Sequence, residues 1–168
     1  MDIEIVEAEI GKVVEIEETI HMWQMPFVMG KDYDQLYTYL KSADCESDEA
    51  PYARYVGIDI AAETSQGFFG MLIDMIFKKW HFFAGVPVAK ELEGEKRIKP
   101  AFVEKQKYIQ TMHKGPYHKV GETYKAIYKW SQEQQLELGD QSIEFYLNDP
   151  RETEKKDLET RVMVQVKP

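Results

Sequence analysis

Residues 30–40 read GKDYDQLYTYL, and residues 121–131 repeat the pattern as GETYKAIYKWS. Both segments begin with glycine and carry tyrosines at their fourth and eighth positions. The tyrosines and the apolar residues near them recur at the spacing of one helix face, so each segment predicts an amphipathic helix. A pattern that occurs twice in one chain predicts two copies of one structural unit.

The segments that flank these helices have strand character in both halves of the chain. Apolar, β-branched and aromatic residues gather at 3–16, 52–60 and 80–88 in the first half, and at 107–112, 142–149 and 159–166 in the second. One such unit cannot bury both faces of its strands alone. We therefore expect a single α+β domain over 1–168, in which repeats 1–88 and 89–168 are related by a pseudo-twofold axis. One curved antiparallel sheet would then carry two main helices.

An apolar insertion distinguishes the first half from the second. Residues 61–79, AAETSQGFFGMLIDMIFKK, have no counterpart in the second half. Thr64 or Ser65 could cap a helix that covers about 66–79 and is apolar on nearly every side. This segment could be an extra core helix, a lid over a hydrophobic pocket, or a contact between subunits.

Composition excludes several classes of protein. The net charge is −9 and no tract rich in lysine or arginine is present, which argues against direct nucleic-acid binding. The single cysteine, Cys45, excludes an internal disulfide and fits a cytoplasmic location. The N-terminus lacks the positive region of a signal peptide. The most apolar run, residues 68–77, is ten residues long and too short to cross a membrane.

No strong catalytic or metal-binding motif is present. The chain contains no GxSxG, P-loop, HExxH or CxxC pattern. His113 and His118 flank the tripeptide GPY, but no acidic residue at ligand spacing accompanies them. We therefore expect neither a metal nor a cofactor.

An acidic residue interrupts the apolar strand SIEFYLNDP at residues 142–150. Successive side chains of a strand point to opposite faces, so Glu144 and Tyr146 share one face while Phe145 and Leu147 share the other. If the helices cover the face of Phe145 and Leu147, Glu144 and Tyr146 line the opposite, concave side.

A glutamate in such a groove would have a raised pKa, because burial disfavours the charged form. It could bind a lipophilic cation, or act as a general base on a bound water. Arg54 lies at nearly the same distance from Gly30 as Glu144 does from Gly121, and we take Arg54 as its equivalent in the first half. Alternatively, Glu144 faces solvent at an edge strand, or pairs with Arg54 or Arg161.

Three segments of the second half resemble a known family. HKGPYHKVGETYKAIYKW at 113–130, SIEFYLNDP at 142–150 and LETRVMVQV at 158–166 are similar to the GyrI-like small-molecule-binding domain. This is also the effector-binding domain of AraC-type and MerR-type multidrug-responsive regulators. The resemblance implies a duplicated strand-helix-strand-strand fold with a ligand groove between the halves. It places the family's ligand-binding glutamate at Glu144 and a groove neighbour at Tyr146.

The resemblance also implies two further activities. Some relatives hydrolyse strained hydrophobic xenobiotics with a glutamate and a tyrosine beside a tryptophan. Glu144 would be the glutamate here, and the candidates for the other positions are Tyr117, Tyr146, Trp23 and Trp130. Other relatives are linked to inhibition of DNA gyrase.

The chain departs from the family pattern in ways that bear on function. It contains no helix-turn-helix segment, so we expect a stand-alone member rather than a regulator. Arg161 occupies a position where a second acid is common, and Gln165 replaces a proline. If Arg161 reached Glu144, the ion pair would lower the pKa of Glu144 and oppose the capture of a cation.

These observations predict a protein that binds a hydrophobic, and possibly cationic, small molecule in an aromatic groove with Glu144 at its floor. Arg54 and Arg161 are candidate ligand contacts beside the aromatic residues named above. Such a protein would sequester or sense xenobiotics. Hydrolysis of an electrophilic lipophile with Glu144 as the base is the enzymatic alternative. A protein partner such as gyrase is a third possibility.

Overall fold

The computed structural model describes residues 1–47, 49–65, 74 and 77–168, and its chain divides into two units. The first unit consists of Met1–Glu9, Val56–Ser65 and Lys105–Pro168. The second consists of Ile10–Tyr55 and Gln66–Glu104. Each unit combines antiparallel strands with one long helix, so the predicted α+β fold class is confirmed.

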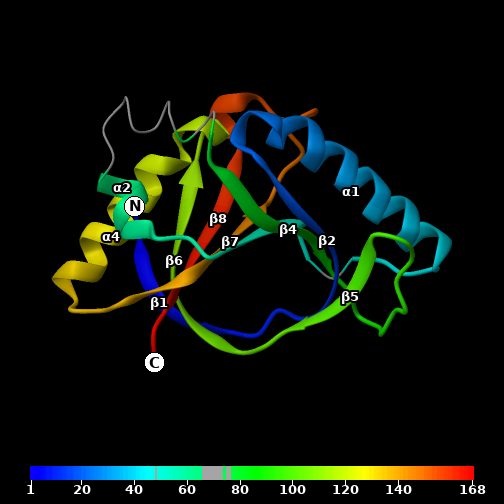
Figure 1. The fold of residues 1–168 in the computed structure, drawn as a ribbon, viewed down its shortest axis with the longest axis horizontal. Coiled ribbons are helices and arrows are strands. Elements are labelled where there is room, and N and C mark those ends of the chain that lie inside the picture. The colour runs from blue at the N-terminus through cyan, green and yellow to red at the C-terminus, as the bar shows by residue number, and fades with distance from the viewer. Residues whose placement is uncertain (48, 66–73, 75–76) are drawn as a thin grey trace. The chain divides into compact units, whose positions relative to one another are not determined.

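The second unit is built around the first of the two repeated helices. Its elements in chain order are β2 (Gly11–His21), η1 (Met22–Gln24), α1 (Met25–Ser42), β3 (Tyr52–Val56), β4 (Lys79–Pro87) and β5 (Ile98–Val103). The strands pair antiparallel in the order β5-β2-β4-β3. Helix α1 packs against β2 and β4, as Figure 1 shows. Its buried stripe consists of Asp32, Leu36 and Leu40, spaced one helical turn apart.

The first unit repeats this plan around the second helix. Its elements are β1 (Ile3–Ala8), α2 (Ile60–Ser65), β6 (Gln106–Lys114), η2 (Tyr117–Lys119), α4 (Val120–Glu133), β7 (Leu138–Tyr146), η3 (Lys155–Asp157) and β8 (Glu159–Val166). The strands pair antiparallel in the order β1-β6-β8-β7. Helix α4 packs against β6 and buries Thr123, Ile127 and Ser131.

The duplicated strand-helix-strand-strand arrangement is present in both units, as β2-α1-β3-β4 and as β6-α4-β7-β8. The remaining strand of each unit comes from the other half of the chain. Strand β1 pairs with β6, although β1 precedes β2, and β5 pairs with β2, although β5 precedes β6. The units therefore take residues from both sides of residue 88, and the division into repeats 1–88 and 89–168 stays an interpretation of the sequence.

Each unit has its own set of fully buried apolar side chains. In the second unit these include Val14, Ile16, Leu36, Phe82 and Ala84. In the first unit they include Tyr108, Ile109, Ile127, Phe145, Val162 and Val164. The helices contribute Leu36 and Ile127 to these sets, so the repeated segments form part of the hydrophobic cores.

The inserted helix predicted at 66–79 lies mostly outside the described residues, which include only 74 and 77–79 of that range. Its roles as a core helix, a lid or a subunit contact stay predictions. Among the described residues, no helix has the length and apolar character that a membrane span requires.

Candidate ligand-binding site

Glu144 lies on β7 and is only 7% exposed. Its Oε1 accepts a hydrogen bond of 2.7 Å from the hydroxyl of Tyr124, which comes from α4. The same hydroxyl lies 3.0 Å from Oγ of Ser142, so serine, tyrosine and glutamate form a continuous chain of hydrogen bonds. With the Tyr124 proton directed at Glu144, the Ser142 hydroxyl is left to donate to Tyr124. This chain fixes one carboxylate oxygen in place.

The second carboxylate oxygen is held more loosely. Tyr146, two residues further along β7, donates to Oε2 over 3.2 Å, which is the long end of the hydrogen-bond range. The ring of Tyr146 contacts the ring of Tyr117 edge-to-face, with centroids 5.4 Å apart. Tyr117 itself belongs to η2, at the start of α4. The structure thus brings together Glu144, Tyr146 and Tyr117 from the residues that the sequence singled out.

The position of α4 corrects one expectation. The groove was considered on the condition that the helices cover the Phe145 face and leave Glu144 on a helix-free side. Instead, Tyr124 of α4 donates directly to Glu144, and α4 therefore lies over the Glu144 face. Thr123, also on α4, bonds His113, which is opposite Thr160 in the sheet, and Thr160 is in turn opposite Tyr146. Glu144 therefore lies on the face of β7 that α4 covers.

Burial controls the acidity of Glu144. Loss of solvent raises its pKa, and the hydrogen bonds from Tyr124 and Tyr146 offset part of that rise. The pKa of Tyr117 is also raised, first by burial and then by the negative charges of Asp149 and Glu144. Glu144 therefore gives up its proton less readily than an exposed glutamate does.

Arg161 faces away from this acid. Strand pairing places Arg161 opposite Phe145 and Val162 opposite Glu144. The Arg161 guanidinium lies over the Phe145 ring, 4.3 Å from its centroid, on the other face of β7. The ion pair with Glu144 that we considered is therefore not favoured by the register, and the pKa of Glu144 is raised rather than lowered.

When the two repeats are aligned on Gly30 and Gly121, Arg54 aligns with Phe145 and Ala53 aligns with Glu144. Ala53 follows Gly30 by 23 residues, as Glu144 follows Gly121. The pairing agrees, because Arg54 is opposite Phe83 and stacks on its ring at 4.2 Å, whereas Phe145 is opposite Arg161 and receives its guanidinium. Our placement of Arg54 at the site equivalent to Glu144 is thus wrong by one residue.

Arg54 instead belongs to a buried ion pair. Its Nε lies 3.0 Å from Glu15 Oε1 and its Nη2 lies 2.7 Å from Glu15 Oε2. Tyr52 donates to the same carboxylate over 2.7 Å. The Tyr52 ring lies against Gly85, where an added Cβ would come within 2.4 Å of it. Glu15 is 3% exposed, so these partners neutralise a charge that water cannot reach.

The two tryptophans of the prediction lie in different units. Trp23 lies in η1 of the second unit and is 58% exposed. Trp130 is half-buried on α4 of the first unit. Ligand contact by Trp23, Trp130, Arg54 or Arg161 stays a prediction.

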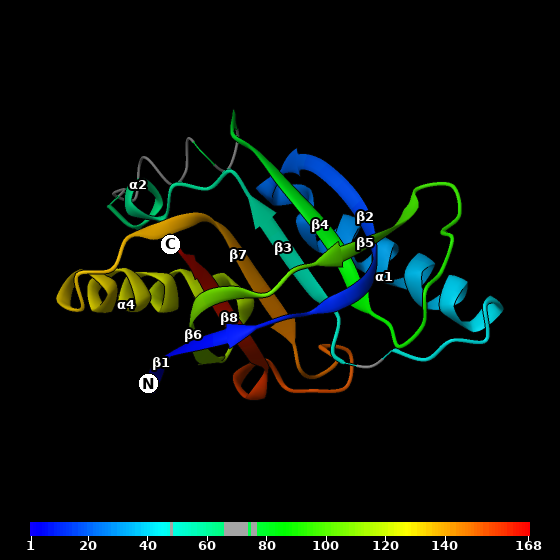
Figure 2. The ribbon, with the colours of Figure 1, turned by 90° about the horizontal axis from the view of Figure 1, so that it is seen from below.

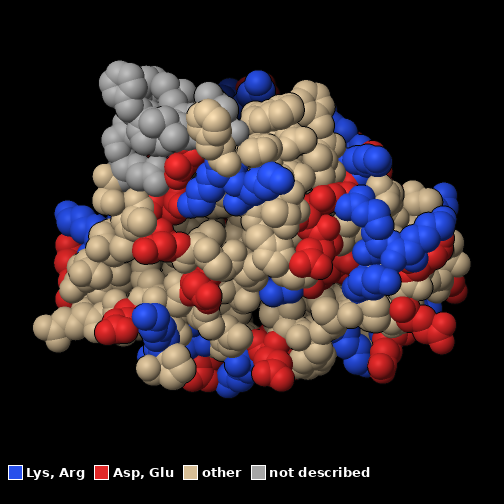
Figure 3. Space-filling view, viewed as in Figure 1, with Lys and Arg blue, Asp and Glu red and all other residues tan. Residues whose placement is uncertain are grey.

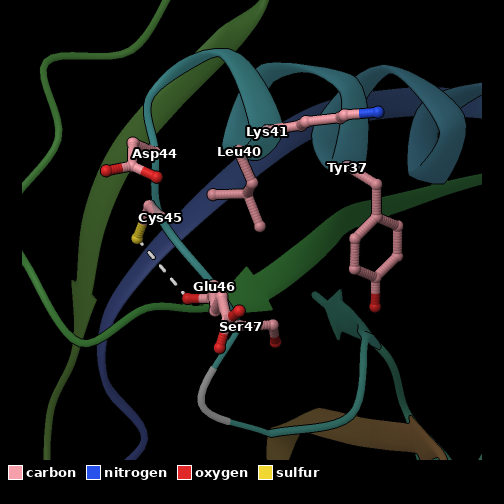
Figure 4. Close-up of a pocket in the computed structure, with 7 residues that line it drawn as sticks. All are labelled: Tyr37, Leu40, Lys41, Asp44, Cys45, Glu46 and Ser47. Carbon is pink, nitrogen blue, oxygen red and sulfur yellow. Dashed lines mark hydrogen bonds between the residues drawn. The ribbon is translucent and has the colours of Figure 1, made fainter.

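A surface hollow of about 590 Å³ lies at the C-terminal end of α1 (Figure 4). Its lining consists of Tyr37, Leu40, Lys41, Asp44, Cys45, Glu46 and Ser47. This volume is sufficient for a drug-sized molecule, but such sites are mostly walled by apolar side chains. Three of these seven residues are charged, which makes the hollow a poor match for a lipophilic ligand. The cluster around Glu144 contains three tyrosines, whereas Tyr37 is the single aromatic residue that lines the hollow.

Within the described parts of the chain, no group of three or more histidine, cysteine or acidic side chains could hold a metal ion. On the face drawn in Figure 3, basic and acidic side chains are intermixed and do not form a single-sign patch. The chemistry available around Glu144 is therefore that of one carboxyl, three phenols and a hydroxyl.

Comparison with protein families identifies the chain. Residues 77–167 match the model of the GyrI-like small molecule binding domain. The chain belongs to this family. The match includes α4, β7 and β8, and with them Tyr117, Tyr124, Glu144 and Tyr146. The resemblance noted in the sequence is confirmed. A search of curated proteins gives no match.

Solved structures share the GyrI-like fold at low sequence identity. EcmrR in complex with DNA is similar at a TM-score of 0.74 and 14% identity, over 99% of this chain and 57% of that one. A hydrolase from Listeria innocua has a TM-score of 0.66 and 13% identity, with 99% and 92% covered. SAV2435 bound to tetraphenylphosphonium has a TM-score of 0.61 and 13% identity, with 99% and 94% covered. The chain thus spans little more than half of the EcmrR chain.

Sequence reasoning missed Tyr124 and Ser142 as members of the site. Tyr124 was noticed only as the partner of Tyr33 in the repeat. Its hydroxyl reaches Glu144, whereas that of Tyr33 donates to the backbone carbonyl of Tyr52. The usable signals were that Ser142 shares a strand face with Glu144 by alternation, and that Tyr124 occupies a tyrosine position that the repeat contains twice.

Proposed function

We propose that this GyrI-like domain binds a lipophilic organic cation against Glu144. The observation that carries the proposal is a buried carboxylate whose oxygens are each held by a phenol, Tyr124 on Oε1 and Tyr146 on Oε2. Tyr117 extends the aromatic surface beyond Tyr146. A carboxylate surrounded by aromatic faces attracts a cation both by its charge and by the quadrupoles of the rings.

The two hydrogen bonds of Glu144 suggest where the ligand arrives. Oε1 is anchored through Tyr124 to Ser142, and Oε2 has only the longer bond to Tyr146. A cation would displace Tyr146 at the lower cost, and the freed phenol ring would remain beside the ligand. The binding of tetraphenylphosphonium by SAV2435, a structure of the same fold, supports this choice of ligand class.

Arg161 does not oppose such a ligand. Its guanidinium lies over Phe145 on the other face of β7, so no fixed positive charge of that residue neutralises Glu144. The doubt that the sequence raised about cationic ligands is thereby weakened. A cation beside Glu144 would favour its ionised form and would therefore lower its raised pKa.

A thermal-shift panel matched in size and shape tests the proposal. We expect tetraphenylphosphonium at about 100 times its Kd to stabilise the protein by about 2.7 kcal/mol, which corresponds to a rise in Tm of roughly 5 °C or more. Tetraphenylborate, an anion of the same shape, and neutral triphenylphosphine oxide should give much smaller shifts. The cation shift should grow as the pH rises through the raised pKa of Glu144. A panel in which only the anion stabilises the protein would refute cation capture.

Hydrolysis is the second candidate, and the Glu144 geometry favours it among enzymatic functions. Glu144 could accept a proton from water while Tyr146 donates one to a leaving group, because both side chains already share a hydrogen bond. The fold is also that of a structure described as a hydrolase from Listeria innocua. Incubation with a strained, electrophilic lipophile followed by mass spectrometry tests this reaction. Stoichiometric binding without product excludes it, and turnover that survives Glu144→Gln excludes the assigned base.

Inhibition of gyrase remains a prediction that a supercoiling assay can test.

A further inference from the structure

A second buried acid lies outside the Glu144 site, where the connection between β4 and β5 runs along α1. Residues 88–97, here termed the strap, contact α1 at several points, and Figures 1 and 2 both show this connection beside the helix. Lys90 Nζ donates to the carbonyls of Ala43 and Asp44 at 2.8 Å each, and the Gly94 amide donates to the Tyr39 hydroxyl at 3.0 Å. Arg97 makes the last contact, with Asp32.

Asp32 is fully buried, and neither of its carboxylate oxygens has a hydrogen-bond partner. The nearest cation is Arg97, whose Nη1 lies 3.5 Å from Oδ1, within ion-pair distance but too far for a good hydrogen bond. The Nη2 of Arg97 is bound instead to Glu18 of β2. A buried carboxylate without donors is costly, so this arrangement demands an explanation.

At the position equivalent to Asp32, the other repeat has a hydrogen-bonded pair without excess charge. Thr123 of α4 is the counterpart of Asp32, because each is the third residue of its repeated segment. Thr123 Oγ1 bonds His113 Nδ1 at 2.8 Å, and the other ring nitrogen of His113 lies 3.3 Å from the Pro116 carbonyl. That pair is hydrogen-bonded and needs no third charge. In the second unit, the corresponding place holds two acids and one arginine.

The charges around Asp32 do not balance when it is ionised. Glu18 and Asp32 would carry two negative charges against the single positive charge of Arg97, with Lys31 of α1 contributing from further away. Burial raises the pKa of Asp32 to about 7, the charge of Glu18 adds to the rise, and Arg97 and Lys31 oppose it. Protonated Asp32 removes the excess charge and can donate to Glu18.

We propose that Asp32, Glu18 and Arg97 form a proton-operated latch: the strap stays closed on α1 while Asp32 is protonated, and loss of the proton favours an open state in which water reaches the Asp32 carboxylate. Ionised Asp32 gains attraction to Arg97 but no donor for either oxygen. The strap is the element whose movement admits water, because the Arg97 side chain is 47% exposed whereas Asp32 is fully buried. The strap remains tethered through Lys90 and Gly94. The latch does not depend on ligand binding at Glu144.

Amide hydrogen exchange followed by mass spectrometry tests the latch on the full chain at pH 6, 7 and 8, after correction for intrinsic exchange rates. The folded pKa of Asp32 lies above its unfolded value, so its stabilising contribution is complete at low pH and is lost as the pH rises through about 7. Above that value, the opening of residues 88–97 and of the first turns of α1 should increase up to about tenfold per pH unit in the wild type. Asp32→Asn should abolish this increase.

Two comparisons separate the latch from a general loss of stability. Helix α4 lies in the other unit, so its exchange at each pH should be the same in the wild type and in Asp32→Asn. Glu18→Gln removes the neighbouring negative charge, so the ionised Asp32 is better tolerated and the response should shrink. Asp32→Thr, which copies the other repeat, should behave as Asp32→Asn does. Parallel pH profiles of residues 88–97 in the wild type and Asp32→Asn, or an equal effect of Asp32→Asn on the exchange of α4, would overturn the latch.

Discussion

Glu144→Gln should raise the Kd for tetraphenylphosphonium by about 30-fold or more, because the loss of a buried partner for a charge costs at least about 2 kcal/mol. Glutamine keeps the size of the side chain and can still bond Tyr124 and Tyr146. The effect therefore reports charge and not shape. Isothermal titration calorimetry at pH 8, where ionised Glu144 is favoured, gives the Kd values directly.

Two further variants make this result specific. Glu159→Gln, on the neighbouring strand β8, removes a carboxylate that is 43% exposed, and should leave the Kd nearly unchanged. Tyr124→Phe removes a hydrogen bond that lowers the pKa of Glu144, so binding at neutral pH should weaken and recover as the pH is raised. Equal Kd values for the wild type and Glu144→Gln would exclude Glu144 as the cation partner.

The same substitution has an opposite effect on stability. Because folding raises the pKa of Glu144, its contribution to stability is complete below the unfolded pKa and is lost as the pH rises through the folded pKa. Above that pH, Glu144→Gln should be at least as stable as the wild type. A ligand-free protein that gains stability while it loses affinity is the signature expected of a residue kept for binding.

Arg54→Ala should lower the free energy of unfolding by about 3 kcal/mol, because it leaves Glu15 buried without its cation. Arg54 retains 15% exposure of its side chain, which places the estimate at the low end for buried pairs. The expected fall in Tm is roughly 6–12 °C for a chain of this length. Urea denaturation and calorimetry of both proteins measure it.

Arg151 provides a control with the same bonding geometry at the surface. Its Nε and Nη2 lie 3.0 and 2.7 Å from the carboxylate of Asp149, as those of Arg54 do from Glu15. The Arg151 side chain is 77% exposed, so Arg151→Ala should cost less than about 1 kcal/mol. The double variant Glu15→Gln with Arg54→Met should recover much of the lost stability. If the two alanine variants proved equally stable, burial would not be what makes the Glu15 pair matter.

Much of the fold could be predicted from the sequence because the same helix pattern occurs in both halves of the chain. The tyrosine pattern located both helices, and apolar runs located strands of both units, as the structure confirms. The alternation in SIEFYLNDP correctly separated Glu144 and Tyr146 from Phe145. Alternation, however, divides a strand into two faces without telling which face a helix covers. That choice depends on contacts such as Tyr124 to Glu144, which join residues far apart in sequence.

The misplacement of Arg54 has a similar cause. Side chains of a strand alternate with a period of two, so an alignment error of one residue moves a side chain to the opposite face. The spacings of 24 residues to Arg54 and 23 to Glu144 differ by that single residue. The true partner of Arg54, Glu15, is separated from it by 39 residues, and no local pattern connects them.

The exchange of strands β1 and β5 has a consequence for how the chain reaches its native state. Ile3 pairs with Thr111, so β1 cannot complete its ladder until most of the polypeptide is available. Pairing between residues so distant in sequence slows folding, because loop closure precedes any energetic gain. During synthesis, β1 must wait for β6, while β2, α1, β3, β4 and β5 all lie before residue 104. A cut after residue 88 would separate β1 from β6 and β5 from β2 and expose an unpaired edge in each product, a known route to aggregation.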